Sequence, residues 1–224
     1  MYSVVIGASG GIGKALADAL EGRGEEVARL SRRGNGLDLT DEASIAAAAT
    51  ALPFPFIERL IVATGMLHED SHGPERSLRQ LNGERLLRSF AVNAVGPALI
   101  LKHFAPLLRR DGPSQAALLS ARVGSIADNR LGGWYGYRAS KAALNQLVRT
   151  AAVEIARTRP QALVVALHPG TVDTAMSRPF QKGVAPERLF SPERSAACLL
   201  EVLDGLGPEQ SGGFFDWQGA PIPF

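Results

Sequence analysis

The sequence predicts an α/β fold in which helices cover both faces of a doubly wound, mostly parallel sheet. Short apolar runs alternate with amphipathic helical segments along the 224 residues, the order expected of βαβ units. A glycine-rich turn at residues 7–13 joins the first apolar run to the first helical segment. No change of composition marks a second domain, so we expect residues 1–224 to form a single domain.

Composition narrows the function classes. Hydrophobic residues make up 46% of the chain and charged residues 21%, which is ordinary for a protein with a substantial core. The net charge is only +2 and no long basic run occurs, so we expect no nucleic-acid partner. The single cysteine, Cys198, excludes an internal disulfide and a cysteine-rich metal site. We recognise neither a signal peptide nor a membrane-spanning run, and therefore expect a cytoplasmic protein without a membrane partner.

The first two strands are expected at residues 2–6 and 26–30, on either side of a helix at 14–23. The glycine-rich turn leaves backbone N–H groups free at the positive end of that helix, where a pyrophosphate can bind. A plain tight turn is the alternative. Because the turn follows a strand and opens a helix, we favour dinucleotide binding by residues that include Gly7, Ser9, Gly11, Ile12 and Gly13.

The residues after the second strand indicate which dinucleotide is bound. An acidic residue here would hold the ribose 2′-hydroxyl of NAD, whereas an arginine accommodates the 2′-phosphate of NADP. No acid occurs between Leu30 and Leu37, and Arg32 and Arg33 follow the strand directly. The sequence therefore favours NADP(H) over NAD(H), although both arginines could also be solvated loop charges.

The middle of the chain alternates in the same way. A helix at 42–51, capped by Thr40 or Asp41, precedes a strand at 57–63 that is closed by Thr64 and Gly65. The polar segment 66–81 contains a cluster that could be mistaken for a metal site, but its spacing fits no ligand pattern, so we interpret it as a solvated loop and expect no metal: His68, Glu69, Asp70 and His72.

A long helix is expected at 83–110, loosened at Gly96 and Pro97. Asn93 lies among apolar residues of this helix and therefore needs a hydrogen-bond partner or a task. A strand at 115–121 follows, and then a loop in which Trp134 and Tyr135 are suited to a pocket wall.

Tyr137 and Lys141 are four residues apart on a helix expected at 136–157, so both lie on one face. A phenol has a pKa near ~10, and an adjacent ammonium lowers it by favouring the phenolate. Tyr137 would then be a general acid/base for a hydroxyl or carbonyl oxygen. Alone the pair is weak evidence, because exposed Tyr–Lys pairs on helices are common.

The chain closes with a strand at 162–168, a long loop, a helix at 193–206 and a strand at 213–217. A loop this long is usually functional, and we expect a lid-like segment at about 171–191. Ligands of open α/β sheets bind at the carboxyl ends of the strands. Several marked segments follow expected strands and should meet there: 7–13, Arg32, Gly65, 120–125 and 169–174.

These motifs together resemble the short-chain dehydrogenase/reductase family, over essentially the whole chain. The glycine turn and the pair Tyr137 and Lys141 match its signatures. The resemblance implies a Rossmann fold, a catalytic Tyr137 and Lys141, and an Asn93 that supports a water relay to the lysine. It also implies cofactor contacts by Asp38, Leu39, Gly65, Tyr137, Lys141, Pro169, Gly170 and Thr174. The run from Ser120 to Asn145 is similar to C-factor and Sniffer-type carbonyl reductases.

Three features depart from the family pattern. The position of the family serine is Ala121, so Ser125 is our candidate replacement, while Ser120 should point to the opposite face of its strand. Residues 62–65 keep only the glycine of the family's Asn-Asn-Ala-Gly motif. The second strand leads almost directly into Leu37, so the intervening helix is expected to be missing and the third strand to be a stub.

The resemblance implies an oxidoreductase that uses NADP(H) to reduce a small carbonyl compound, or to oxidise the alcohol, with Tyr137 as general acid/base. A sensor or signalling protein with vestigial catalysis is the alternative, and an epimerase or dehydratase would need a larger substrate domain. The pocket is expected to be small and apolar, near Met66, Met176 and Phe180. We also expect a homodimer or homotetramer that packs through the helices at 83–110 and 136–157.

Overall fold

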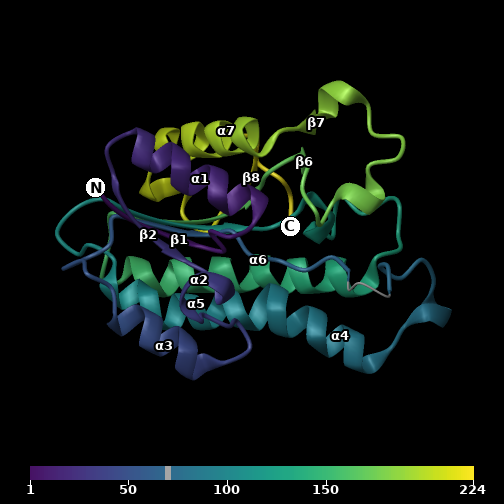
Figure 1. The fold of residues 1–224 in the computed structure, drawn as a ribbon, viewed down its shortest axis with the longest axis horizontal. Helices are drawn as coiled ribbons and strands as arrows, with labels where there is room; N and C mark the ends of the chain where they lie inside the picture. The colour runs from purple at the N-terminus through teal and green to yellow at the C-terminus, as the bar shows by residue number, and fades with distance from the viewer. Residues whose placement is uncertain (69–71) are drawn as a thin grey trace.

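The computed structural model describes residues 1–68 and 72–224. Its central sheet has six strands in the order β2-β1-β3-β4-β5-β8, and every pairing is parallel. The expected α/β fold with a doubly wound parallel sheet is confirmed (Figure 1). The strands are β1 Tyr2–Ile6, β2 Glu26–Leu30, β3 Arg59–Val62, β4 Ser114–Leu119, β5 Ala162–His168 and β8 Phe214–Asp216.

Helices cover both faces of the sheet. In Figure 1, α1 (Gly11–Gly22) and α7 (Pro192–Gly205) lie above it, and α3 (Glu42–Thr50), α5 (Gly96–Phe104) and α6 (Tyr135–Ala156) lie below it. Except at the edge strand β2, the strands are buried on both sides because their side chains alternate between two cores. On β5, Val164 packs into the core with α5 and α6, whereas Val165 packs into the core with α1 and α7.

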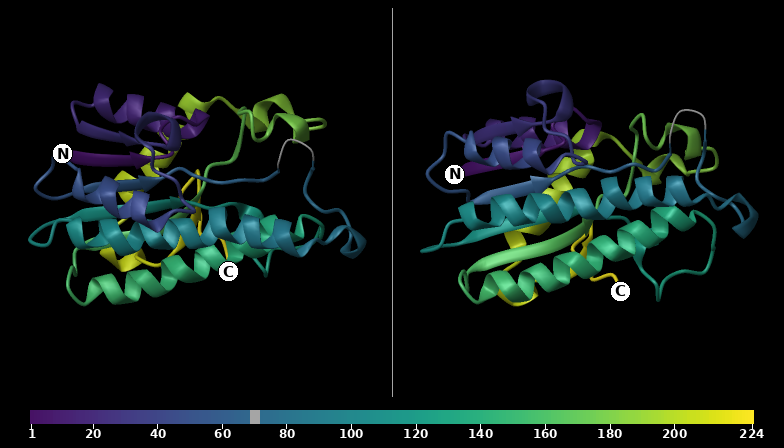
Figure 2. Two further views of the ribbon diagram at one scale, coloured as in Figure 1. Left: turned by 60° about the horizontal axis from the view of Figure 1, so that its bottom comes forward. Right: turned by 90° about the horizontal axis from the view of Figure 1, so that it is seen from below.

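The predicted long helix is interrupted earlier than expected. It consists of α4 (Gly83–Phe90), a π-helical turn at Ala91–Val95, α5, and a 3-10 turn at Ala105–Leu107. Pro97 explains the position of the π turn, because a proline lacks an N–H and its ring presses on the carbonyl four residues earlier, that of Asn93. Figure 2 shows α4 and α5 as one nearly continuous rod beside α6.

The stretch Gly83–Leu107 is long and apolar enough to cross a membrane by length and composition alone. The sequence led us to expect a helix here and no membrane-spanning run. Within it Ile100, Leu101 and Phe104 are packed in the core against the sheet. A core helix passes the same test of length and hydropathy, so the stretch is weak evidence for a membrane segment.

The sheet ends at β2. After this strand the chain forms a single helical turn, α2 (Arg32–Asn35), which Ser31 caps by accepting a hydrogen bond from the Gly34 N–H. The intervening helix is therefore reduced to one turn, and the stub of a third strand is not formed: residues 37–39 have no strand pairing, and the Leu37 side chain is buried in the core instead. The residues between β2 and α3 consequently lie beside the carboxyl end of the sheet.

The segment between β5 and α7 contains structure that the sequence did not predict. Two short strands, β6 (Thr171–Val172) and β7 (Leu189–Phe190), pair in parallel and close the base of this segment. Figure 1 shows it projecting beyond α7, on the side toward which the strands run. The remaining short turns are 3-10 helices at Leu78–Gln80, Arg122–Gly124, Arg178–Phe180, Pro186–Arg188 and Pro208–Gln210.

Candidate active site

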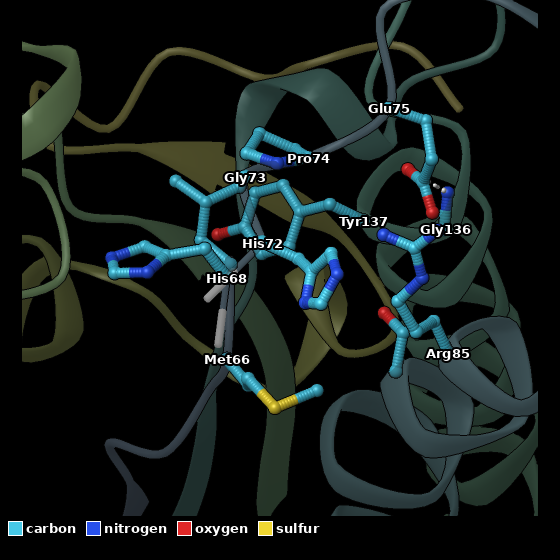
Figure 3. A pocket seen from close by; sticks show the side chains of 11 residues that line it. Met66, His68, His72, Gly73, Pro74, Glu75, Arg85, Gly136 and Tyr137 are labelled. Atoms are coloured by element: carbon cyan, nitrogen blue, oxygen red, sulfur yellow. Dashed lines mark hydrogen bonds between the residues drawn. The ribbon is translucent and has the colours of Figure 1, made fainter. Parts of the chain in front are cut away.

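The amino end of α6 is held in place by a residue that the sequence analysis missed. Its N-cap, Trp134, has a left-handed backbone (φ 53°) and offers no side-chain cap. Glu75 supplies the cap from another segment: its carboxylate accepts a hydrogen bond from the Gly136 N–H (3.1 Å), and its carbonyl accepts one from the Trp134 N–H (2.5 Å). Figure 3 shows this carboxylate beside Gly136 in a small pocket that Tyr137 also lines. No sequence pattern links Glu75 to a helix that starts sixty residues later.

Tyr137 and Lys141 lie on successive turns of α6, as predicted. Lys141 is 2% exposed, and its Nζ donates a hydrogen bond to the Leu119 carbonyl (2.7 Å) at the end of β4. The same Nζ lies 6.0 Å from the centroid of the Tyr137 ring. The helix thus presents a phenol and an amine to the carboxyl end of the sheet.

The expected lowering of the Tyr137 pKa is not found in this structure. Burial raises the pKa of Tyr137 to about 12 and lowers the pKa of Lys141 to about 7. The physical reason is that both charged forms lose hydration, and an amine with a pKa near neutrality carries little average charge to stabilise a phenolate. At neutral pH Tyr137 therefore holds its proton and can donate it.

Asn93 has the partners that its burial requires. Its Oδ1 accepts from the Met66 N–H (2.7 Å), and its Nδ2 donates to the Met66 carbonyl (2.8 Å) and to Ser140 Oγ on α6 (3.1 Å). The side chain therefore ties the segment after β3 to the helix that carries Tyr137. Gly65 lies at the same junction, where an added Cβ would be 3.4 Å from Lys141 Nζ.

The glycine turn is shaped by close backbone contacts. Gly7 has φ 88°, and a Cβ on Gly13 would lie 2.2 Å from the Gly7 carbonyl oxygen. A Cβ on Gly11 would meet Thr174 Cγ2 at 2.9 Å. Gly10, the N-cap of α1, has no side chain to satisfy the first N–H groups of the helix. Backbone donors are thus free at the place where the sequence predicts a pyrophosphate.

A groove of about 410 Å³ runs from this turn to α4. Six of the fourteen predicted cofactor residues line it, together with Arg88, which the sequence did not predict. Hydrogen bonds from the Thr40 N–H and hydroxyl, helped by Arg32 and Arg88, lower the pKa of Asp38. Thr64 Oγ1 is buried without a hydrogen-bond partner among the described residues. The lining includes Gly7, Ser9, Arg32, Arg33, Asp38, Leu39, Thr64, Gly65 and Arg88.

Free N–H groups, an unpaired hydroxyl and a set of arginines fit a phosphate-bearing dinucleotide. A second cavity of about 430 Å³ adjoins the groove at Met176, which lines both. Its wall is mostly apolar and contains Tyr137, Ser120 and Ala121. Its other lining residues include Ile12, Leu67, Val123, Trp134, His168, Pro169, Gly170, Thr174, Phe180 and Val184.

Comparison with known proteins agrees with this geometry. A model of the short chain dehydrogenase family matches residues 2–185. The chain belongs to the short-chain dehydrogenase/reductase family. It is 41% identical to the C-signal protein of Myxococcus xanthus over 140 residues, which cover 62% of this chain and 78% of that one. It is 30% identical to 1-hydroxy-2-glutathionyl-2-methyl-3-butene dehydrogenase of Rhodococcus sp. (strain AD45), over 94% of each chain.

Solved structures give the same result. The NADPH-bound carbonyl reductase from chicken fatty liver has a TM-score of 0.86 at 25% identity, over 100% of this chain and 98% of that one. A carbonyl reductase from Pseudomonas aeruginosa PAO1 has a TM-score of 0.79 at 27% identity, over 100% of both chains. The chain is accordingly an NAD(P)-dependent oxidoreductase of this family.

The two serines near the family position are both engaged elsewhere. Ser125 is buried, its Oγ accepts a hydrogen bond from the Asp128 N–H (3.1 Å), and it is not among the residues that line the cavity. The Ser120 hydroxyl donates to Asn145 Oδ1 on α6 (2.6 Å). Ala121 occupies the strand end between them and lines the cavity. The structure therefore does not bring the Ser125 hydroxyl to Tyr137.

The expected pocket residues are mostly in place. Met66, Trp134, Met176 and Phe180 line the groove or one of the two pockets beside Tyr137, whereas Tyr135 is not among the lining residues described. Gly170 has φ 80° and abuts Phe190 and Trp217, which fixes the segment after β5. Among residues 1–68 and 72–224 no group of three potential ligands could hold a metal ion. Glu69 and Asp70 of the expected loop cluster lie outside the described residues.

Proposed function

We propose that the protein uses NADP(H) to reduce a small carbonyl compound, with Tyr137 as the proton donor. The observation that carries the proposal is the position of Tyr137, which lies on the wall of a mostly apolar cavity that adjoins the dinucleotide groove. Burial raises the pKa of Tyr137 to about 12, so the hydroxyl is protonated at neutral pH. A protonated phenol suits the direction of carbonyl reduction, in which the substrate oxygen gains a proton.

The other residues of the site have supporting roles in this proposal. Lys141 holds the cofactor ribose and replaces the Tyr137 proton, and Asn93 supports the water path by which that proton returns. A bound nicotinamide cofactor supplies or accepts the hydride. Ser125 has no role that its contacts support, because its hydroxyl caps a turn. Tyr137 is therefore the proposed proton donor in the cavity. A second polar group of the wall would have to take the place of the hydroxyl that Ala121 lacks.

NADP(H) is proposed over NAD(H) because Arg32, Arg33 and Arg88 line the far end of the groove. Two proteins of similar structure, including the chicken carbonyl reductase, have been solved with NADPH bound, which supports the choice. Residues 171–191 are proposed as a lid, since Met176, Phe180 and Val184 line the cavity and Phe180 contacts Trp134 with ring centroids 5.5 Å apart.

We propose that the whole chain is one cytoplasmic catalytic domain that forms a homodimer or homotetramer. An apolar groove between α5 and α6, lined in part by Leu101, Leu147 and Ala151, supports packing between copies. Light scattering that gives a monomer mass at micromolar concentration would remove the oligomer from the proposal. We propose neither a nucleic-acid partner nor a membrane partner.

A signalling role is the second candidate, because the C-signal relative is 41% identical and Ala121 replaces the family serine. The deciding experiment is a screen of NADPH oxidation against aldehydes, ketones and quinones. We expect activity, and we expect Tyr137→Phe to lower kcat by ~10² or more while NADPH binds nearly as before. NADPH binding without turnover on any compound favours signalling, and a Tyr137→Phe variant with full activity would refute the assigned proton donor.

A further inference from the structure

His168 is a half-buried titratable residue to which the mechanism above gives no task. It ends β5, whose residues Val164 and Ala166 pack into the core on the α5 and α6 face. By the alternation of side chains along a strand, His168 points to that same face. The neighbouring strand end brings Ser120 beside it, because the Ser120 N–H donates to the Leu167 carbonyl (2.8 Å).

The substrate cavity has few polar groups on its wall, and most of them are committed to protein partners. The Ser120 hydroxyl bonds Asn145, Arg122 pairs with Asp128 (2.6 Å), and Ser177 Oγ donates to the Val172 carbonyl (2.5 Å). His168 also lines the cavity, but one of its ring nitrogens is not committed to a protein partner. Its Nδ1 is enclosed and has no hydrogen-bond partner in the described part of the chain.

The enclosed Nδ1 decides which ring nitrogen carries the proton. Burial lowers the pKa of His168 to about 4, so the ring is neutral at pH 7 and has one N–H. Asp216, its partner on β8, accepts instead from the Gln218 and Ala220 N–H groups (2.9 and 3.0 Å). A buried N–H without an acceptor is costly, so the proton belongs on Nε2. His168 as a residue is half-buried, and of its two ring nitrogens only Nδ1 is enclosed without a partner, which leaves Nε2 as the nitrogen that can face the cavity.

We propose that His168 contacts the substrate, donating a hydrogen bond from Nε2 to the carbonyl oxygen that Tyr137 protonates. This inference rests on the proposed carbonyl reduction. It assigns to a histidine at the end of β5 the second donor that Ala121, at the end of β4, does not supply. A donor in a largely apolar cavity orients an oxygen strongly, because a substrate bound the wrong way leaves both partners unpaired.

The test separates the two ring nitrogens. In a glutamine side chain the amide nitrogen occupies roughly the place of Nε2, whereas in asparagine it occupies roughly that of Nδ1. With benzaldehyde and NADPH as the probe, His168→Phe is expected to lower kcat/KM about tenfold to a hundredfold. His168→Gln should keep most of the activity, and His168→Asn should resemble His168→Phe. The dissociation constant of NADPH should change less than about twofold in all three variants, since the cofactor does not depend on this donor.

Ala121→Ser gives a second readout, because it places a hydroxyl on the same wall of the cavity. Added to His168→Phe, it should recover a large part of the lost kcat/KM. A merely structural role would lower the melting temperature and NADPH affinity of His168→Phe, and Ala121→Ser would restore neither. Equal activity of the wild type and His168→Phe, or equal losses in the asparagine and glutamine variants, would overturn the proposal.

A binding measurement keeps this test apart from the test of the proposed function. In the NADP⁺ complex, titration with benzyl alcohol should shift the Nε2 resonance of His168 and leave those of His103, which lies on α5 and contacts Glu42, in place. If the wild type reduces no carbonyl compound, the proposed reductase function fails, and this titration alone decides the role of His168. An unmoved Nε2 resonance at saturating alcohol refutes it.

Discussion

The two ends of the parallel sheet differ in whether their buried polar groups have hydrogen-bond partners. At the amino end Arg59 is buried, and its guanidinium bonds Gln115 (3.1 Å), Glu25 (3.3 Å) and Asp204 (2.7 Å). At the carboxyl end the structure leaves three buried polar atoms unpaired in its described part, and they belong to Thr64, Asn145 and His168.

The difference separates a group whose hydrogen bonds stabilise the fold from groups that the fold leaves without partners. Buried polar groups are nearly always hydrogen-bonded, so unpaired ones that gather at one end of a sheet mark a place where partners are missing. The same end holds Tyr137 and Lys141, whose pKa values burial moves to about 12 and about 7. Replacing the buried cation at the amino end should therefore destabilise the free protein, whereas replacing the one at the carboxyl end should stabilise it.

The largest effect is expected for Arg59→Met. In the described part of the chain, the variant leaves Glu25, whose side chain is 9% exposed, with the Ser3 hydroxyl as its one remaining side-chain partner. Loss of one member of a buried charge network costs about 3–5 kcal/mol of unfolding free energy. Urea unfolding measures it, and Lys14→Met, which breaks an exposed pair with Asp18, is the control with a cost of about 1 kcal/mol or less. Equal costs for the two variants would remove the contrast between the ends.

Lys141→Met should act in the opposite direction. Burial lowers the pKa of Lys141 from 10.5 to about 7, so between those pH values the unfolded chain binds the proton and the folded chain does not. Wild-type stability should therefore rise with pH across this window, and the variant should lose that rise. At pH 7 the cofactor-free variant should melt at a higher temperature than the wild type, by a margin that shrinks toward pH 10.5. Lys102→Met, at an exposed pair, is the control.

A Lys141→Met variant that melts lower than the wild type at every pH would contradict this interpretation. It would mean that the hydrogen bond from Nζ to the Leu119 carbonyl stabilises the fold more than the buried amine destabilises it. The carboxyl end would then resemble the amino end, with a satisfied cation at its centre.

The arginines of the groove lie at the carboxyl end of the sheet, and Arg32→Ala tests their part in cofactor binding. Arg32 lines the groove and its loss should weaken NADPH binding by roughly 1–3 kcal/mol, the scale of a charge-assisted hydrogen bond, with little effect on NADH. Calorimetric titration with both cofactors measures the change, and Arg23→Ala near the amino end is the control. Equal affinities of the wild type for NADPH and NADH would defeat the proposed preference.

The sequence predicted the elements well because their signals are local. The strand at 162–168, the helix with Tyr137 and Lys141, and the glycine turn depend on apolar periodicity and on glycine sterics. The π-helical turn was missed because the effect of Pro97 spreads toward Asn93, one turn earlier.

Tertiary contacts could not be derived in this way. Glu75 caps α6 across a long stretch of sequence, and Arg88 reaches the groove from α4. Ser125 was chosen because it follows the strand end by one short turn, but that turn uses the hydroxyl for its own Asp128 N–H. The pKa of Tyr137 was misjudged for a related reason, since helical spacing gives the distance of a cation and says nothing of how deeply both groups are buried.

Thr64→Val should give the smallest effect and the most specific one. Valine matches the shape of threonine without its hydroxyl, and Thr64 Oγ1 has no partner to lose among residues 1–68 and 72–224. The free protein should therefore keep its stability within about 1 kcal/mol or become slightly more stable. NADPH binding should weaken, because Thr64 lines the groove and we expect the bound cofactor to supply the partner that the enclosed hydroxyl lacks. Thr50→Val, at a hydroxyl that already bonds the Ala46 carbonyl, is the control for stability. Thermal melting with and without NADPH measures both quantities. A Thr64→Val variant that loses stability without cofactor would show that the hydroxyl has a partner in the free protein, and the unpaired groups would no longer mark the ligand end.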